Sequence, residues 1–413
     1  MRKIKKERSC RLCGSSDLDS VLNLASTPPA NAFIPKSRID LEQKKYPLEL
    51  FFCKDCYHVQ LLEIVDPVEL FENYVYVSGT SPVFVDHFYK YAQHVVDTYK
   101  PSKDLLVLDI GSNDGTLLKF FKTQGYTTIG VDPAKEISKK AQQEGIETIN
   151  DFFTLELSEK IKNKYSLASL ITANNVFAHC DDLKGMTKAI YNLLSPEGLF
   201  IFEVSYLLDV YQKTLFDTIY HEHLSYHSVI PLVKFFQENN MELIDVKKIN
   251  THGGSIRCVV QKSSGHRKVN KSVQEFVQLE KSMSFDKKDK FINFSENISK
   301  KKRELNKFLH EIKSENKTIV GFGAPAKATT LMYEFGLDND VLEFIVDDSP
   351  WKQELYSPGL HIPILSSSYI KTFKPDYLLI LAWNFANSII KKNQEYTQSG
   401  GKFIIPLPNL EVI

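Results

Sequence analysis

The sequence predicts an α/β protein with a small N-terminal metal-binding module and two parallel sheets, each covered by helices. Two Cys-x2-Cys pairs lie within the first 56 residues. Apolar strand-like runs then alternate with helix-like segments, and glycine-rich turns follow two of these runs, at 111–115 and at 321–326. Strands that alternate with helices form doubly wound parallel sheets, and a glycine turn at the end of a strand leaves room for a ligand.

Length and charge narrow the class of protein. At 413 residues the chain is long enough for two or three domains. Lysine plus arginine and aspartate plus glutamate number 51 each, which removes the simple electrostatic argument for nucleic acid or an anionic membrane as a partner. The basic N-terminal residues are not followed by an apolar segment, and no run approaches membrane-spanning length. We therefore expect a cytoplasmic protein.

The four N-terminal cysteines are spaced for one metal ion. Cys10 and Cys13 form the first pair, and Cys53 and Cys56 form the second. Four thiolates fill every position of a tetrahedral Zn²⁺ ion, so the pattern predicts a structural zinc site. The 39 residues between the pairs exceed the usual spacing, which leaves a degenerate or iron-bearing site open, and His58 is an alternative ligand.

Alternating strand-like and helix-like segments between residues 83 and 261 predict a central sheet. A helix is expected over 83–100, and the two strands nearest the end of this region should close the sheet. The expected strands are 105–110, 127–132, 168–173, 199–203, 243–246 and 257–261.

The turn after the first of these strands has a ligand-binding pattern. Gly111 and Gly115 clear space for a ligand, and Asp132 ends the next strand, where its carboxylate can accept both hydroxyls of a ribose. Asp109 is acidic and the loop is not GxGxxG, which favours the cationic S-adenosylmethionine over a dinucleotide with its pyrophosphate. We expect Asn113 to contact the same ligand. A turn that binds no ligand is the alternative.

Two further segments carry polar side chains suited to catalysis. At the end of the strand expected at 168–173, Asn174 is expected near the cofactor, and His179 can orient a reacting group, although a single histidine there is more often structural. Residues 220–227 hold three histidines, a glutamate and two tyrosines, a composition that suits proton transfer. The spacing is not HExxH, which excludes a zinc-peptidase motif. The alternative is a polar loop whose side chains only form hydrogen bonds with one another.

A second strand and helix unit begins near residue 318. The sequence at 321–326 matches GxGxxA, and Asp347 and Asp348 follow about 25 residues later. Lys327 offers a positive charge for a phosphate. A nicotinamide cofactor, a nucleotide-sugar diphosphate and a pure scaffold all remain open for this domain.

Together these motifs resemble the three-domain sugar C-methyltransferases, which use S-adenosylmethionine to methylate a ring carbon of nucleotide-linked 4-keto deoxysugars. The resemblance runs almost end to end, and the string Tyr-His-Glu-His-Leu at 220–224 is its most specific motif. The segments that carry it are the cysteine module, 29–33, 74–78, 109–115, 174–179, 220–224, 251–257 and 321–327.

The resemblance implies roles for the clustered side chains. His223, oriented by Glu222, would remove the proton next to the sugar carbonyl. Tyr220 and His179 would stabilise the resulting enolate oxygen, and the remaining active-site tyrosine falls on Tyr76. The residues expected to bind the substrate are Asn31, Tyr74, His221 and Lys327.

The same resemblance predicts the domain organisation and the ligands. A class I methyltransferase domain with a Rossmann-like, doubly wound sheet should lie between a zinc-binding domain and a C-terminal Rossmann-like domain. The expected ligands are S-adenosylmethionine, Zn²⁺ and a sugar linked to dTDP or another nucleoside diphosphate. The predicted segments are a zinc-binding domain at 1–75, the methyltransferase domain at 76–265 and the C-terminal domain at 317–413. Residues 266–316 are expected to form a helical linking segment, because this stretch is polar, lysine-rich and helix-permissive.

Cys180, Asp181 and His227 depart from the family pattern, which leaves the identity of the sugar open. The methylated carbon and the oligomeric state are open too. An O- or N-methyltransferase, an epimerase-like enzyme and a zinc-containing scaffold are the competing interpretations.

Overall fold

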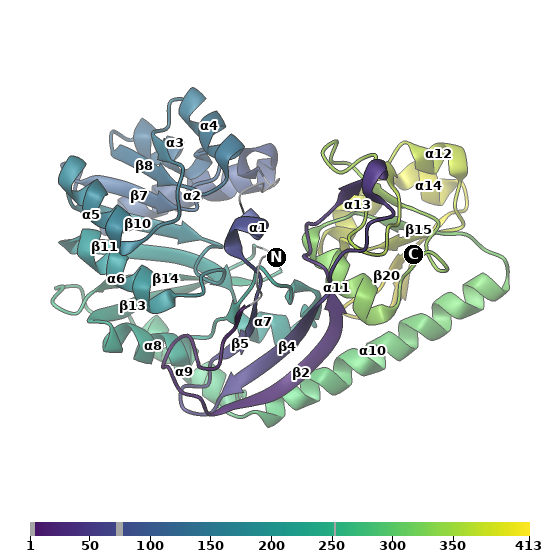
Figure 1. Cartoon of the computed structure of the whole chain (residues 1–413), viewed down its shortest axis with the longest axis horizontal. Helices are drawn as coiled ribbons and strands as arrows, with labels where there is room; N and C mark the ends of the chain where they lie inside the picture. Colours follow the sequence, from purple (N-terminus) through teal and green to yellow (C-terminus); the bar gives the residue numbers. More distant parts are fainter. Residues whose placement is uncertain (1–4, 72–76, 252) are drawn as a thin grey trace.

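The computed structural model describes residues 5–71, 77–251 and 253–413. We call its three parts the N-terminal module (5–71), the central domain (described residues of 77–265) and the C-terminal domain (317–413). Figure 1 shows the central domain in blue and teal, the C-terminal domain in yellow-green, and the purple strands of the N-terminal module between them.

A seven-stranded sheet forms the core of the central domain. Its strands are β7 (Leu106–Ile110), β8 (Thr127–Val131), β9 (Thr148–Ile149), β10 (Ala168–Asn174), β11 (Leu194–Ser205), β13 (Met241–Ile249) and β14 (Ser255–Lys262). They lie in the order β13-β14-β11-β10-β7-β8-β9, and β14 runs antiparallel to both of its neighbours. The predicted doubly wound sheet, closed by two final strands, is confirmed.

Helices cover both faces of this sheet. They are α2 (Pro82–Tyr99), α3 (Thr116–Thr123), α4 (Lys135–Gln143), α5 (Leu155–Lys164), α6 (Leu183–Leu193), α7 (Leu207–Gln212) and α8 (Val229–Glu238). Strand β7 is buried at every position, with Leu108 in one apolar core and Val107 in the other. A strand enclosed in this way reads as a nearly continuous apolar run, interrupted here only by Asp109, which is why the sequence identified it. The helix expected over 83–100 is α2, which begins at Pro82, where a missing N–H is tolerated.

The C-terminal domain is a second, smaller α/β unit. Its strands are β15 (Ile319–Phe322), β16 (Ile345–Asp347), β18 (Ile364–Ser366), β19 (Tyr377–Ile380), β20 (Lys402–Ile405) and β21 (Glu411–Val412). Its helices are α11 (Ala326–Phe335), α12 (Tyr369–Phe373), α13 (Ala386–Lys392) and α14 (Gln394–Gln398). The strand order is β18-β16-β15-β19-β20-β21, parallel except at β21, so the glycine loop after β15 lies at the centre of the sheet.

Two helices form most of the linking segment. Helix α9 (Lys271–Ser282) packs on β13, and the long helix α10 (Asp289–Ser314) runs beside strand β2 (Leu18–Thr27) towards the C-terminal domain (Figure 1). One face of α10 is apolar, as expected for a helix that packs along only one side. The buried residues of α10 are Phe291, Phe294, Ile298, Leu305, Leu309 and Ile312.

The N-terminal module is joined to both other domains by strand pairing. Its main strands are β2, β4 (Tyr46–Cys53) and β5 (Val59–Leu61), and the sheet is completed by β12 (Ser225–Tyr226) of the central domain. On the other side, β3 (Ile34–Pro35) pairs with β17 (Leu355–Tyr356) of the C-terminal domain. The sequence did not predict either pairing. Within the described residues, no helix combines the length and apolar composition needed to cross a membrane.

Candidate active site

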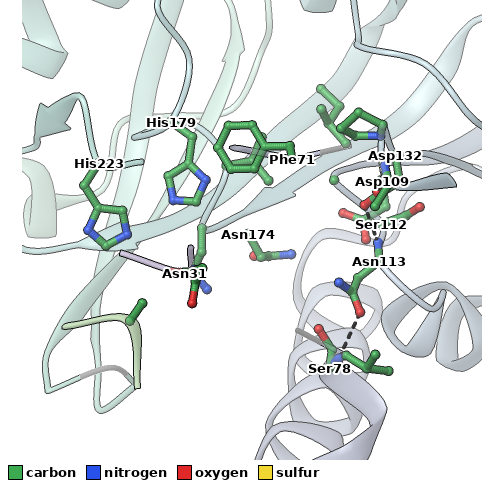
Figure 2. Close-up of a pocket in the computed structure, with 18 of the residues that line it drawn as sticks. Asn31, Phe71, Ser78, Asp109, Ser112, Asn113, Asp132, Asn174, His179 and His223 are labelled. Atoms are coloured by element: carbon green, nitrogen blue, oxygen red, sulfur yellow. Dashed lines mark hydrogen bonds between the residues drawn. The ribbon is translucent and has the colours of Figure 1, made fainter. Parts of the chain in front are cut away.

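A cavity of about 750 Å³ lies where the three parts of the chain meet. Figure 2 shows Asp109, Asn113 and Asp132 at one end, His179 and His223 at the other, and Asn174 between them. Side chains from all three parts line the cavity, including Asn31 of the N-terminal module and the start of helix α11. The structure therefore brings the residues predicted to bind the cofactor and those predicted to transfer the proton to one cavity.

The end of the cavity beside β7 is shaped by the glycine turn. Gly111 has φ 68°, and a Cβ atom there would lie 2.3 Å from Cγ2 of Val176. Gly115 has φ 74° and directly precedes helix α3. Both glycines are therefore required by the backbone conformation, and Gly111 also by the close approach of Val176.

Carboxylates organise the same turn. Asp132 accepts hydrogen bonds from the backbone N–H groups of Asn113, at 2.9 Å, and Ala134, at 2.8 Å. Burial raises the pKa of Asp109 to about 7, although the Thr172 hydroxyl donates to its carboxylate at 2.6 Å. Burial also raises the pKa of Asp132. Two buried carboxylates beside a cavity favour a ligand that carries positive charge.

Two features of this turn were not predicted from the sequence. The Ser112 hydroxyl is buried on the cavity wall and has no hydrogen-bond partner among the described residues, so it is available to a ligand. The backbone N–H groups of Ser78 and Gly79 donate to the side chains of Asn113, at 2.9 Å, and Asp114, at 3.0 Å (Figure 2 shows the Ser78 bond). The short turn η2 (Ser78–Thr80) is thereby fixed over the glycine turn.

Four aromatic rings gather at the other end of the cavity. The His179 and His223 rings are stacked, with centroids 5.0 Å apart, and the Tyr220 ring lies 4.1 Å from that of His223. The Phe71 ring stacks on the outer face of His179 at 5.5 Å. All four side chains line the cavity. The prediction that His179, Tyr220 and His223 lie together is therefore supported by their geometry.

His223 is oriented by a backbone carbonyl. Its Nδ1 atom lies 2.8 Å from the carbonyl oxygen of Thr218. Because a carbonyl can only accept, Nδ1 must carry the proton, which leaves the lone pair of the neutral ring on Nε2. The expectation that Glu222 accepts the proton of Nδ1 and so orients the ring is corrected here, since Nδ1 donates to the Thr218 carbonyl oxygen.

Glu222 instead holds Asn31. The Glu222 side chain is buried and accepts a hydrogen bond from Asn31 Nδ2 at 2.8 Å. Burial raises the pKa of Glu222 to about 7, and the Asn31 amide opposes that shift. Asn31 lines the cavity, whereas Glu222 is not among the described residues of its wall.

His221 and His227 point into the protein interior. His221 packs edge-on against Tyr46, and its Nε2 lies 3.3 Å from the Pro47 carbonyl oxygen. The His227 ring is fully buried and stacks on Phe177. Neither is among the described residues that line the cavity, so the geometry does not support the prediction that His221 binds the substrate. Side-chain direction in an irregular loop cannot be read from sequence spacing.

Lys327 lines the cavity but is paired with a carboxylate. Its Nζ lies 3.0 Å from Oδ2 of Asp217, which also accepts from Trp383 Nε1 at 2.6 Å. Burial lowers the pKa of Lys327, and Asp217 opposes that shift. The geometry therefore assigns Lys327 to an ion pair between domains rather than to a phosphate. Lys352, also on the cavity wall, donates to the carbonyl of Ala324 in the glycine loop at 2.7 Å.

Tyr74 and Tyr76 lie outside the described residues, so their predicted roles remain predictions.

The four cysteines fit a zinc ion. Their sulfur atoms all lie within 4.8 Å of one another, and the Cys10–Cys56 and Cys13–Cys53 Sγ pairs are each 3.5 Å apart. Sulfurs bound to tetrahedral zinc at about 2.3 Å would be about 3.8 Å apart, close to these values. Within the described residues, no other group of three or more His, Cys, Asp or Glu side chains has ligand atoms close enough together to hold one metal ion.

The cysteine site is connected to the cavity through Arg11. This buried side chain lies between two of the cysteines in sequence, and its Nε donates to Asp181 on the cavity wall at 3.1 Å. Asp181 follows His179 by two residues. The sequence flagged Asp181 only as a departure from the family pattern.

Family models match three successive parts of the chain. The model for a zinc binding domain matches residues 10–71, the model for a methyltransferase domain matches 86–246, and the model for a C-methyltransferase C-terminal domain matches 250–408. With the sheet order and the cysteine cluster, these matches define a class I, Rossmann-like S-adenosylmethionine-dependent methyltransferase flanked by a zinc-binding domain and a C-terminal α/β domain.

Individual relatives make the assignment more specific. The C-methyltransferase NovU of Streptomyces niveus is 32% identical over 404 residues, which cover 98% of this chain and 96% of that protein. The chain therefore belongs to the family of three-domain S-adenosylmethionine-dependent C-methyltransferases, as the motifs predicted.

Two further matches are limited to part of the chain. The mitochondrial ubiquinone biosynthesis O-methyltransferase of Bos taurus is 30% identical over 115 residues, 26% of this chain and 31% of that protein. The crystal structure of magnesium protoporphyrin IX methyltransferase from Synechocystis PCC 6803 with bound S-adenosylmethionine covers 43% of this chain and 77% of its own, with 15% identity and a TM-score of 0.32.

Proposed function

We propose that this C-methyltransferase acts on a nucleotide-linked 4-keto deoxysugar, at a ring carbon next to the carbonyl. The observation that carries the proposal is the single cavity that joins the glycine turn of β7, the rings of His179, Tyr220 and His223, and the start of α11. Its volume of about 750 Å³ is within the range of about 300–1,000 Å³ typical of small-molecule sites.

We assign the proton transfer to His223. A carbon next to a ketone becomes a nucleophile only after it loses a proton. With Nδ1 bonded to the Thr218 carbonyl, Nε2 of the neutral ring has the lone pair that can accept this proton. A positioned base of this kind contributes about 10²–10⁴-fold to a rate.

We assign stabilisation of the enolate oxygen to the rings beside the base. Tyr220 and His179 flank His223 and can donate hydrogen bonds to an oxygen that gains negative charge. Glu222 acts as a positioning residue in this scheme, because it holds the Asn31 amide at the cavity wall. The active-site role predicted for Tyr76 stays a prediction, because Tyr76 lies outside the described residues.

The cofactor binds at the glycine turn in this proposal. When bound, S-adenosylmethionine supplies an electrophilic methyl group on a positively charged sulfur. The residues that would hold it are Asp109, Gly111, Ser112, Asn113, Gly115, Asp132 and Asn174. The buried hydroxyl of Ser112 and the two buried carboxylates fit its donors and its charge.

The nucleotide part of the substrate would meet the C-terminal domain. Lys352 and the glycine loop line the cavity, and burial lowers the pKa of Lys352. A nearby diphosphate would favour the charged form of this amine. Because Asp217 neutralises Lys327, we assign the phosphate contact to Lys352 instead.

Zn²⁺ has a structural role in this proposal, since the four cysteine thiolates leave no open position for a substrate.

The experiment that tests the proposal is mass spectrometry of reactions in deuterated water. The purified protein is incubated with nucleotide-linked 4-keto-6-deoxy sugars, once with S-adenosylmethionine and once with S-adenosylhomocysteine. With the methyl donor, a carbon-bound hydrogen should be replaced by a methyl group. With the demethylated analogue, the sugar should exchange one carbon-bound hydrogen for deuterium.

The His223→Gln variant provides the control, since it should lose both the methylation and the exchange. Methylation on oxygen or nitrogen, without exchange, would overturn the proposal in favour of an O- or N-methyltransferase. Exchange by the His223→Gln variant at the rate of the unchanged protein would refute the assignment of the base.

A further inference from the structure

The carbonyl that orients His223 belongs to a segment held by the C-terminal domain. Thr218 ends the single turn η3 (Phe216–Thr218), whose three residues are all buried. The N–H of Ile219 donates to the Phe216 carbonyl at 2.9 Å, which fixes the peptide plane that contains the Thr218 carbonyl. The direction of that carbonyl therefore depends on how residues 216–219 are held.

Asp217 forms the first contact between this turn and the C-terminal domain. Its carboxylate is fully buried, and one oxygen accepts from Lys327 Nζ at 3.0 Å and from Trp383 Nε1 at 2.6 Å. The Lys327 ammonium also lies 4.2 Å from the centre of the Trp383 ring. Three side chains from two domains thus form one buried cluster next to Thr218.

Helix α11 makes further contacts with the same segment. The Thr330 hydroxyl donates to the Ile219 carbonyl at 2.7 Å, and the Phe335 ring packs against Phe216 with centroids 5.1 Å apart. The neighbouring Thr329 hydroxyl donates to the Ala30 carbonyl of the N-terminal module at 3.0 Å. Helix α11 therefore contacts both the 216–219 segment and the loop that carries Asn31.

We propose that the C-terminal domain sets the tautomer of His223. Through Asp217, Lys327, Trp383 and Thr330 it holds residues 216–219 so that the Thr218 carbonyl accepts the Nδ1 proton. Asp217 and Thr330 are then positioning residues for the proton transfer, although neither needs to touch the substrate. The inference rests on the proposed function only in naming His223 as the base, because the tautomer itself is independent of any reaction.

In this inference the C-terminal domain has a second role, the orientation of His223, besides the proposed binding of the nucleotide. In a free imidazole the two neutral tautomers interconvert readily, so a base that must keep one nitrogen unprotonated needs a fixed acceptor on the other. If the C-terminal domain served only as a scaffold, α11 would need to pack tightly, but the proton of His223 could lie on either ring nitrogen. The scaffold role and the positioning role therefore differ in which nitrogen of His223 carries the proton, and this can be measured.

The test is nitrogen NMR of the full-length protein with ¹⁵N-labelled histidine, which shows which ring nitrogen carries the proton. The His223 signals are assigned by their loss in His223→Gln. Two variants loosen the segment. Thr330→Val removes the hydroxyl donor and keeps the side-chain volume, whereas Trp383→Phe removes the indole N–H together with part of the ring beside Lys327.

A matched control is available in α6. Thr187 is a buried helical threonine whose hydroxyl has no hydrogen-bond partner within the described chain, so Thr187→Val changes the same atoms without loss of a bond.

The unchanged protein and the control should show His223 protonated on Nδ1. Thr330→Val and Trp383→Phe should both show a fraction protonated on Nε2, with kcat reduced about five- to tenfold, as expected for one lost hydrogen bond, and KM for S-adenosylmethionine unchanged. Retention of the Nδ1 tautomer in both folded variants would overturn the inference, as would an Nε2 proton in the unchanged protein. If no sugar nucleotide is a substrate, the proposed function fails but the tautomer still decides this inference.

Discussion

Substitution of Glu222 by Gln should make the protein more stable, by an amount that depends on pH. Glu222 is 2% exposed, and burial raises the pKa of its carboxyl to about 7 from an ordinary value of 4.5. The folded protein therefore binds a proton there more tightly than the unfolded chain does. The protonated carboxyl stabilises the fold below pH 4.5, and this contribution is lost as the pH rises towards 7.

The size of the effect follows from the two pKa values. Each pKa unit corresponds to about 1.4 kcal/mol, so between pH 5 and pH 8 the contribution of Glu222 falls by about 2.5 kcal/mol. Gln has the same shape, stays neutral at both pH values and keeps an oxygen for the Asn31 amide. The free-energy difference between Glu222→Gln and the unchanged protein should therefore shift by about 2.5 kcal/mol in favour of the variant.

The assay is urea denaturation of both proteins at pH 5 and pH 8, monitored by tryptophan fluorescence. Glu395→Gln is the control, because this exposed carboxylate has a pKa that is lowered by its hydrogen bond to Lys371, and its substitution should bring no gain as the pH rises. An equal difference at both pH values for Glu222→Gln would refute the reasoning, since it would mean that Glu222 titrates as in the unfolded chain.

Three other outcomes are expected. His223→Gln should reduce kcat by about 10²–10⁴-fold. His221→Gln should keep most of the turnover, because Gln can still donate to the Pro47 carbonyl. Equal losses of kcat in steady-state assays would contradict the assignment of proton transfer to His223 and of a structural position to His221. Gly111→Ala should weaken S-adenosylmethionine binding in calorimetry, since φ is 68° and the added Cβ would lie 2.3 Å from Val176; unchanged affinity would show that the turn can relax. Metal analysis should find one Zn²⁺ per chain. A chelator should remove this ion and lower the melting temperature of the protein. An unchanged melting temperature after removal would exclude a structural role for the zinc ion.

The sequence predicted the main elements of the fold because their signals are local. Strand β7 is an apolar run interrupted only by Asp109, residues 266–316 have a helix-permissive composition, and glycines mark the turn at 111–115, where the structure has positive φ at Gly111 and Gly115. The two Cys-x2-Cys pairs predicted a metal site for the same reason, since the spacing within each pair fixes the reach of its thiolates.

The contacts between domains could not be predicted in this way. Glu222 bonds to Asn31 across 191 residues, and Lys327 pairs with Asp217 across 110 residues. The sequence placed Glu222 beside His223, because the two residues are adjacent in the chain. The structure gave that place to the Thr218 carbonyl, a backbone group whose direction no residue type encodes.

The sequence by itself determined the domain types, most strands of the central sheet, the glycine turn at 111–115 and the cysteine cluster, since each depends on spacing along a few residues or one element. Only the tertiary structure decided which side chains face the cavity, which acceptor orients His223, and that strands β12 and β17 join the N-terminal module to its neighbours. These features depend on the packing of segments that are distant in sequence, and burial then fixes the hydrogen bond or charge partner of each polar group.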